Sequence, residues 1–183
     1  MQPHRPTSTN MDAVATLCPK CGLCCNGVLF GDVELHAGDN AGRLRDLGLL
    51  LERRGKVLRF SQPCSCFDGR LCRIYEQRPK RCRSFECSLV QRVNAGTLGI
   101  EGALKAIRHV GEEVRIVREL LHKLGQRDEE LPLSRRCAKV ISQPIDLTAS
   151  EEEIELRGEL LLAISKLTNI LQRDFLEGSG KSS

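Results

Sequence analysis

Aromatic residues are scarce in this chain of 183 residues, which has no Trp, one Tyr (Tyr75) and five Phe. Aromatic side chains usually supply much of the apolar surface that a core buries. The N-terminal half is also poor in aliphatic residues, so hydrophobic burial is a weak source of stability there. The composition therefore predicts a second stabiliser in that half, and a bound metal can supply folding free energy directly.

Long apolar segments are also missing. No run of 18 apolar residues occurs, which predicts that no helix crosses a membrane and excludes functions that need one. Residues 1–17 lack the apolar stretch of a secretory signal, so we expect a cytoplasmic protein whose cysteines stay reduced. The formal net charge of +4 is mild and favours no class of partner.

Cysteine, in contrast, is abundant. The chain has ten, and four of them lie in the run Cys-Pro-Lys-Cys-Gly-Leu-Cys-Cys at residues 18–25. Core packing does not require such a density of small residues, whereas a soft metal ion or an iron–sulfur cluster does. A disulfide framework is the alternative, but two adjacent cysteines and the missing signal argue against it. The predicted ligands are Cys18, Cys21, Cys24, Cys25, Cys64, Cys66, Cys72, Cys82 and Cys87.

The spacing of the thiols bears on the kind of metal centre. Three of them recur at three-residue steps, as in the C-x-x-C-x-x-C run of bacterial ferredoxins, whereas zinc ribbons more often use two separate C-x-x-C pairs. The cofactor predicted is therefore an iron–sulfur cluster, with zinc as the alternative. Cys25 directly follows Cys24, and neighbouring side chains tend to diverge, so Cys25 either serves a second centre or is simply buried. Eight thiolates would make two four-sulfur sites, and four or five would make one. The number of ligands and the number of metal centres both stay open.

Six basic residues lie between positions 70 and 83. Such a cluster can mark a nucleic-acid surface, but no pattern of stacking aromatics accompanies it. Thiolates around a metal carry net negative charge, and arginines beside them offset that charge and donate hydrogen bonds to sulfur. We therefore predict a supporting role near the metal for Arg73, Arg78, Arg83 and Tyr75, and no nucleic-acid partner.

The two cysteine motifs together resemble a known family. The run at residues 18–25, followed by C-x-I-Y-E-x-R-P-x-x-C-R-x-F-x-C, is similar to the CxxCxxCC cysteine-cluster family, also called YkgJ-like and described as zinc- or iron-chelating. The resemblance spans about residues 15 to 95. It departs at Cys64-Ser-Cys66, where the family more often has one cysteine, which leaves open which of the two is a ligand.

The resemblance implies a metal-binding protein. The family also resembles the cluster-containing part of a flagellin lysine methylase, so the alternative is an iron–sulfur enzyme or enzyme subunit linked to protein lysine methylation or electron transfer. The sequence shows no catalytic base, nucleophile arrangement or paired carboxylates, and we predict no catalytic residue and favour a non-catalytic module. The four histidines are not predicted as ligands, and Cys137 is predicted to be a buried free thiol.

Residues 97–176 differ in kind from the cysteine-rich half. A helix is predicted from a cap at Thr97 to about Leu124, stopped by Gly125, with a close contact or kink at Gly111. A second begins at the capping box Ser150-Glu-Glu-Glu and runs to about Leu176. A short helix at 134–141 lies in the connector between them. The apolar stripes are predicted at Ile100, Leu104, Ile107, Val114, Val117, Leu121 and Leu124, and at Ile154, Leu161, Ile164, Leu167, Leu171 and Phe175.

The predicted fold class is α+β, mainly α: a small irregular module nucleated by metal, with short strands, followed by a C-terminal helical hairpin. Strands are expected at 28–30, continuing to 33–35, and at 56–60, with a helix from Asp39 or Asn40 to Arg54 and a short helix beginning at Pro79. The domains are a disordered arm at 1–13, the metal-binding module at 14–96, the helical region at 97–176 and a disordered tail at 177–183. The helical region either packs on the module or pairs with a protein partner or a second copy.

Overall fold

The structure is a computed structural model that describes residues 13–144 and 150–177. It is mainly helical with one small antiparallel sheet, which confirms the predicted fold class. The arm at 1–12 and the tail at 178–183 lie outside the described residues, whereas Ala13, placed in the arm, begins the first helix. The short elements are α1 (Ala13–Cys21), α2 (Ala41–Asp46), η1 (Tyr75–Gln77), α3 (Lys80–Ser84), α4 (Ser88–Asn94) and α6 (Leu133–Ile141).

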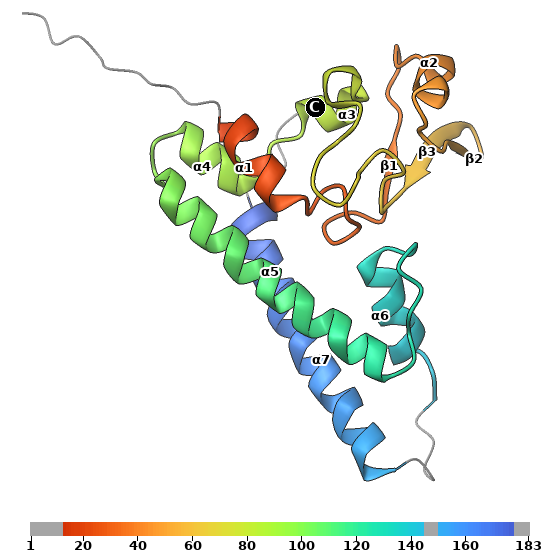
Figure 1. Cartoon of the computed structure of the whole chain (residues 1–183), viewed down its shortest axis with the longest axis vertical. Helices are drawn as coiled ribbons and strands as arrows, with labels where there is room; N and C mark the ends of the chain where they lie inside the picture. The colour runs from red at the N-terminus through yellow and green to blue at the C-terminus, as the bar shows by residue number, and fades with distance from the viewer. Residues whose placement is uncertain (1–12, 145–149, 178–183) are drawn as a thin grey trace, which may run out of the picture.

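Two long helices, α5 (Ile100–Lys123) and α7 (Glu151–Leu171), run side by side and extend away from the part that carries the sheet (Figure 1). This confirms the predicted helical hairpin. The π-helical turn η2 (Gln172–Leu176) continues α7 and reaches α4. The larger hydrophobic core lies along α5 and includes Leu17, Leu23 and Leu89 from the cysteine-rich half. It therefore crosses the predicted boundary at residue 97, because α1 and α4 both pack against α5.

The signals that start and stop these helices act largely as expected. The Ser150 hydroxyl accepts a hydrogen bond from the Glu153 N–H at 3.2 Å, and Gly125, with φ of 81°, follows the end of α5. The cap at Thr97 was wrong: Gly99 precedes α5, and the Thr97 hydroxyl donates instead to the Arg92 carbonyl. The contact at Gly111 was also wrong, since no atom lies within 4 Å of the position a Cβ would take.

The buried face of α7 differs from the prediction. Ile154 and Leu161 are exposed, at 48% and 52%, whereas Leu160 is 1% exposed. Residues 160–162 are three consecutive leucines, so the sequence does not say which of them faces the core. Packing of α7 on α5 buries Leu160. The buried positions of α7 are Leu160, Leu167 and Ile170.

Strands β1 (Asp32–Glu34), β2 (Glu52–Arg54) and β3 (Val57–Ser61) form an antiparallel sheet in the order β1-β3-β2. Residues 28–30 are not a strand. The helix expected to reach Arg54 ends at Asp46, because Gly48 turns the chain with φ of 92°, and residues 52–54 pair with β3 instead. The sheet supports a second, smaller core made of Val33, Leu44, Leu49, Phe60, Cys64, Cys66 and Ile74.

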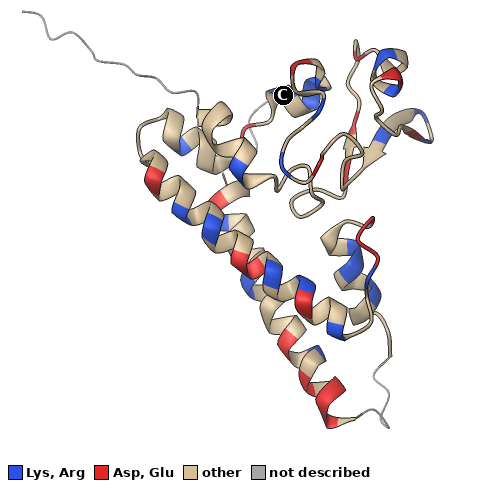
Figure 2. Ribbon diagram, viewed as in Figure 1, with Lys and Arg blue, Asp and Glu red and all other residues tan. Residues whose placement is uncertain are grey.

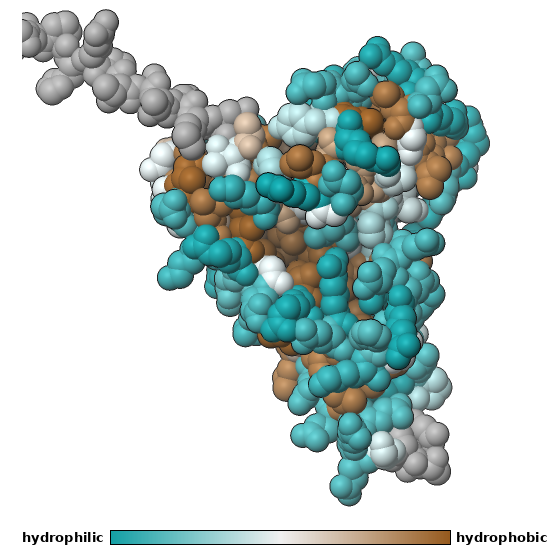
Figure 3. All heavy atoms as spheres, in the orientation of Figure 1, coloured by the Kyte–Doolittle hydropathy of each residue, from teal (hydrophilic) through white to brown (hydrophobic). Residues whose placement is uncertain are grey.

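Charged and apolar residues gather at different places on the molecule. Acidic and basic residues are interspersed along α5 (Figure 2), and Arg115 pairs there with Glu112 and Glu119. Apolar side chains reach the surface where the upper part of the molecule meets the long helices (Figure 3). In the described part of the chain, no helix is long and apolar enough to cross a membrane.

Candidate metal centre

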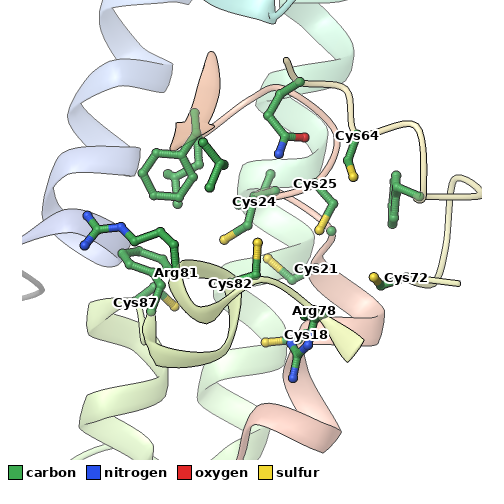
Figure 4. A pocket seen from close by; sticks show the side chains of 18 of the residues that line it. Cys18, Cys21, Cys24, Cys25, Cys64, Cys72, Arg78, Arg81, Cys82 and Cys87 are labelled. Carbon is green, nitrogen blue, oxygen red and sulfur yellow. The ribbon is translucent and has the colours of Figure 1, made fainter. Parts of the chain in front are cut away.

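A cavity of about 460 Å³ lies between the two cores, and cysteines dominate its chemistry. Its walls come from α1 and the following turn, from β1, from the segment at 60–75, and from α3 and the start of α4 (Figure 4). The rings of Phe30 and Phe85 meet edge to face at 5.0 Å and join two of these walls. The cysteines that line it are Cys18, Cys21, Cys24, Cys25, Cys64, Cys72, Cys82 and Cys87.

Local hydrogen bonding explains how the first cysteine run folds. Cys18 and Cys21 lie on α1, and Gly22, with φ of 65°, ends the helix. The Gly22 carbonyl accepts hydrogen bonds from the N–H groups of Cys25 (2.9 Å) and Asn26 (3.0 Å), which turns the chain back. A Cβ at Gly22 would lie 3.0 Å from the Phe67 ring, so a side chain there would also disturb the cavity wall.

Cys64 and Cys66 have different surroundings. The Cys64 N–H donates to the Cys25 carbonyl at 2.9 Å, which ties the second cysteine segment to the first. Cys66 is fully buried in the smaller core, its thiol faces the Leu47 carbonyl at 3.7 Å, and it is not among the residues that line the cavity. The structure thus separates two positions that the sequence left equivalent.

The remaining predicted ligands reach the cavity from three short elements. Cys72 pairs with Phe67 in an isolated β-bridge, Cys82 lies on α3, and Cys87 is the residue that precedes α4. Cys137 is buried in the larger core, where α6 packs on α5, and does not line the cavity. All ten cysteines are free thiols.

The thiols surround the cavity without forming a finished coordination sphere. Within residues 13–144 and 150–177, no three His, Cys, Asp or Glu side chains converge closely enough to hold a metal ion. The donor set nevertheless fits a soft metal, because thiolates select zinc, copper(I) and iron–sulfur clusters over hard cations. Binding would therefore need the thiols to turn inward.

Burial strongly favours the neutral form of these thiols. It raises the pKa of Cys24 well above the usual range and also raises the pKa of Cys72 and of Cys87. Repulsion from neighbouring thiolates raises the pKa of Cys24 further. Burial is likewise the largest cause of a pKa of about 12 for Cys21, Cys25, Cys64 and Cys82. A cation bound in the cavity would offset both the cost of burying a thiolate and the repulsion between neighbouring thiolates.

One arginine is held beside the thiols. The Arg78 guanidinium carbon lies 3.6 Å from the centre of the Tyr75 ring, and its Nε donates to the Tyr75 carbonyl at 2.8 Å. Its positive charge lowers the pKa of Cys25, Cys72 and Cys82, against the larger effect of burial. Arg83 also lines the cavity, whereas Arg73 lies outside its lining and donates to the Ser65 carbonyl.

Several residues of the cavity were not predicted. Arg70 and Arg81 line it, as does His36, although no histidine was expected near the thiols. His36 follows Asp32 and Glu34 at two-residue steps, and this alternation along a strand was the available signal that all three share one face. The carboxylates of Asp32 and Glu34 form ion pairs with Arg59.

Gln62 was also missed. It is 2% exposed, lines the cavity two residues before Cys64, and its Oε1 atom has no hydrogen-bond partner. An unsatisfied buried acceptor costs about 1–3 kcal/mol, so native proteins rarely leave one without a reason. An orphaned amide in a wall of thiols fits a cavity that normally holds a bound group.

We expect Arg78→Leu to weaken metal binding about 10- to 100-fold, the usual effect of removing a group that supports metal ligands. The reason is the loss of the positive charge near three of the thiols. Arg78→Lys should keep most of the affinity, and Arg53→Leu, which changes an exposed arginine on β2 outside the cavity, should have no effect. Competition titration with a metal chelator measures all three. Equal affinities for Arg78→Leu and the wild type would contradict this role.

Comparison with known proteins agrees with the chemistry of the cavity. Residues 17–98 match the model of the CxxCxxCC family, described as a "putative zinc- or iron-chelating domain". Searches of curated proteins and of solved structures found no match. The segment at 17–98 thus matches the model of the family that the two cysteine motifs resemble, and it includes every cysteine that lines the cavity.

Proposed function

We propose that this protein is a metal-binding module whose cavity thiolates hold iron as an iron–sulfur cluster, with zinc as the alternative metal. The observation that carries the proposal is that eight cysteines, from segments up to about 70 residues apart, line one cavity. Packing alone would distribute small residues through a core rather than gather them around a space. Such a thiol-rich lining matches the metals that the family description names.

Two features of the cavity favour the iron–sulfur form. Cys18, Cys21 and Cys24 keep the three-residue step on which ferredoxin clusters are built. Arg78 supplies hydrogen-bond donors and a positive charge beside the sulfurs, and hydrogen bonds to sulfur are a principal means of setting a cluster's potential. A bound cluster would supply one-electron chemistry, and the chain's own residues would hold it and shield it from water.

We further propose that Cys64, rather than Cys66, is a ligand. Cys64 lines the cavity and its backbone is hydrogen-bonded to Cys25, whereas the Cys66 thiol faces a carbonyl of the smaller core. Cys66 thus acts as a small core residue.

The test is anaerobic purification followed by measurement of iron, zinc and acid-labile sulfide. With one Tyr and no Trp, absorption bands above 300 nm identify a cluster clearly. We expect Cys64→Ala to lose metal, and Cys66→Ala to keep it while losing about 1 kcal/mol of stability from a small cavity. A folded, reduced, metal-free wild-type protein would refute the proposed function, and equal metal loss in both variants would refute the choice of Cys64.

The same preparation separates a binding module from an enzyme subunit. A cluster with a reproducible reduction potential would favour electron transfer or radical chemistry. Tightly held zinc, which has no redox chemistry of its own, would favour a structural or sensing module.

A further inference from the structure

We propose that the eight cysteines form two separate four-sulfur centres. The first consists of Cys18, Cys21, Cys24 and Cys87, and the second of Cys25, Cys64, Cys72 and Cys82. This division rests on the proposed function, since it presupposes that the cavity binds metal. It goes further by assigning each thiol to a centre.

The two hydrophobic cores divide five of the eight thiols in the same way. Cys21 and Cys87 pack against the larger core, which runs along α5. Cys64 belongs to the smaller core under the sheet, and Cys72 and Cys82 pack against that core. Each proposed centre is therefore anchored to one of the two cores, and the cavity lies between them.

The elements that carry the first group are neighbours in the fold. Cys18 and Cys21 are three residues apart on α1, so they lie on one face of the helix. α1 packs against α4, and Cys87 is the residue that precedes α4. Among the thiols that raise the pKa of Cys21, the effect of Cys87 is the largest, followed by that of Cys18.

The adjacent pair Cys24–Cys25 is where the two centres meet. In Figure 4 the two side chains extend in different directions from neighbouring backbone positions, and Cys25 lies on the side of Cys64 whereas Cys24 points away from it. The hydrogen bond from the Cys64 N–H to the Cys25 carbonyl holds the backbones of these two residues together. The thiols with the largest effects on Cys25 are Cys72 and Cys82, ahead of Cys18.

The second group is closed by α3. The thiols that most affect Cys82 are Cys64 and Cys72, and those that affect Cys64 are its near neighbour Cys66 first, then Cys25 and Cys72. Arg78 acts on Cys25, Cys72 and Cys82 together, so one cation serves three members of this group.

Space and charge are both sufficient for two centres that each hold a single divalent ion, the zinc form of the proposed function. The cavity of about 460 Å³ greatly exceeds the roughly 30 Å³ that one water occupies in the liquid, and a zinc ion is no larger than a water. A divalent ion with four thiolates carries a net charge of about −2, so two such centres carry about −4. Four arginines line the cavity and offset this charge: Arg70, Arg78, Arg81 and Arg83.

The experiment counts metal in the full-length chain and in single-cysteine variants. Zinc and iron per chain are measured after anaerobic purification, and cobalt(II) titration of the apoprotein gives a second count from thiolate–cobalt absorption. We expect two centres per wild-type chain. Cys87→Ser should lose about half of the signal, Cys72→Ser the other half, and the double variant nearly all of it. Cys137→Ser and Cys66→Ala, whose thiols lie outside the cavity lining, are the matched controls and should keep both centres.

The neighbouring pair gives the sharpest comparison. Cys24→Ser should behave like Cys87→Ser, and Cys25→Ser like Cys72→Ser, although the two positions are adjacent. One centre per wild-type chain, lost equally in all of these variants, would overturn the division while leaving metal binding intact. A wild-type chain that binds no metal would overturn the proposed function itself. The number of metal centres per wild-type chain does not depend on whether any variant folds, so the assignment of the cysteines to two centres remains testable.

Discussion

Removing the metal is expected to unfold the region from about residue 31 to residue 82 while α5 and α7 stay helical. The smaller core in this region contains one Phe and four aliphatic residues, and its other two buried members are cysteines. Structural thiolate sites supply on the order of 10 kcal/mol of apparent binding free energy, comparable with the whole stability of a small domain. Without that contribution, so small a core should not hold the sheet and the loops around it.

The long helices have an independent source of stability. The larger core along α5 contains Val110, Val117, Leu121 and Leu160, each nearly inaccessible to solvent, and its cysteine members are few. Within the cysteine-rich half, α1 and α4 pack on this core, so we expect them to keep more protection than the sheet.

Hydrogen exchange on the protein before and after chelation measures this difference directly. Protection should be lost over β1, β2, β3 and α3 and kept over α5 and α7. Cys25→Ser should reproduce part of the loss without chelator, and Cys137→Ser should not. Equal loss in both regions would show that the chain is one cooperative unit, and preserved protection over the sheet would show that the sulfurs are not structural ligands.

Acid is expected to release the metal steeply. The pKa of Cys21, Cys25, Cys64 and Cys82 is about 12 in the folded metal-free chain, so these thiols carry protons at neutral pH. A thiol must lose its proton to bind metal, so each ligand releases about one proton on binding at any pH below its pKa. A lower pH therefore favours the protonated, metal-free state, and a higher pH favours binding.

The size of this effect follows from the number of ligands. For a centre with four thiolates, the apparent binding constant should fall by up to about 10⁴-fold for each unit of pH lost between pH 8 and pH 6. Competition titrations at several pH values give the slope, and a weakly buffered titration with a pH indicator counts the protons. Cys64→Ser should release about one proton fewer from its centre, and Cys66→Ala should leave the count unchanged. Binding without proton release would mean that the ligands are not these thiols.

The sequence by itself determined the chemistry of the site and the local elements. The C-x-x-C-x-x-C-C run and the second cysteine motif identified the metal-binding segment, because thiolate spacing is a property of the chain alone. The ends of α5 and α7 were also readable at Gly125 and Ser150, since caps and stops depend on hydrogen bonds within a few residues. The stretch from position 39 to 54 was less informative, and the helix predicted there was longer than α2, which ends at Asp46.

Only the tertiary structure decided which thiols share a space. Cys64 and Cys66 are two residues apart, yet one lines the cavity and the other is enclosed by the smaller core, and no local signal separates them. The packing of α1 on α4 and α5 likewise brings Cys87 toward residues some 65 positions earlier, and it joins the two halves that composition suggested were separate. Tertiary packing also decided which face of α7 is buried, with Leu160 rather than Leu161 in the core. Such choices depend on contacts between distant segments, whose free energy no single stretch of sequence contains.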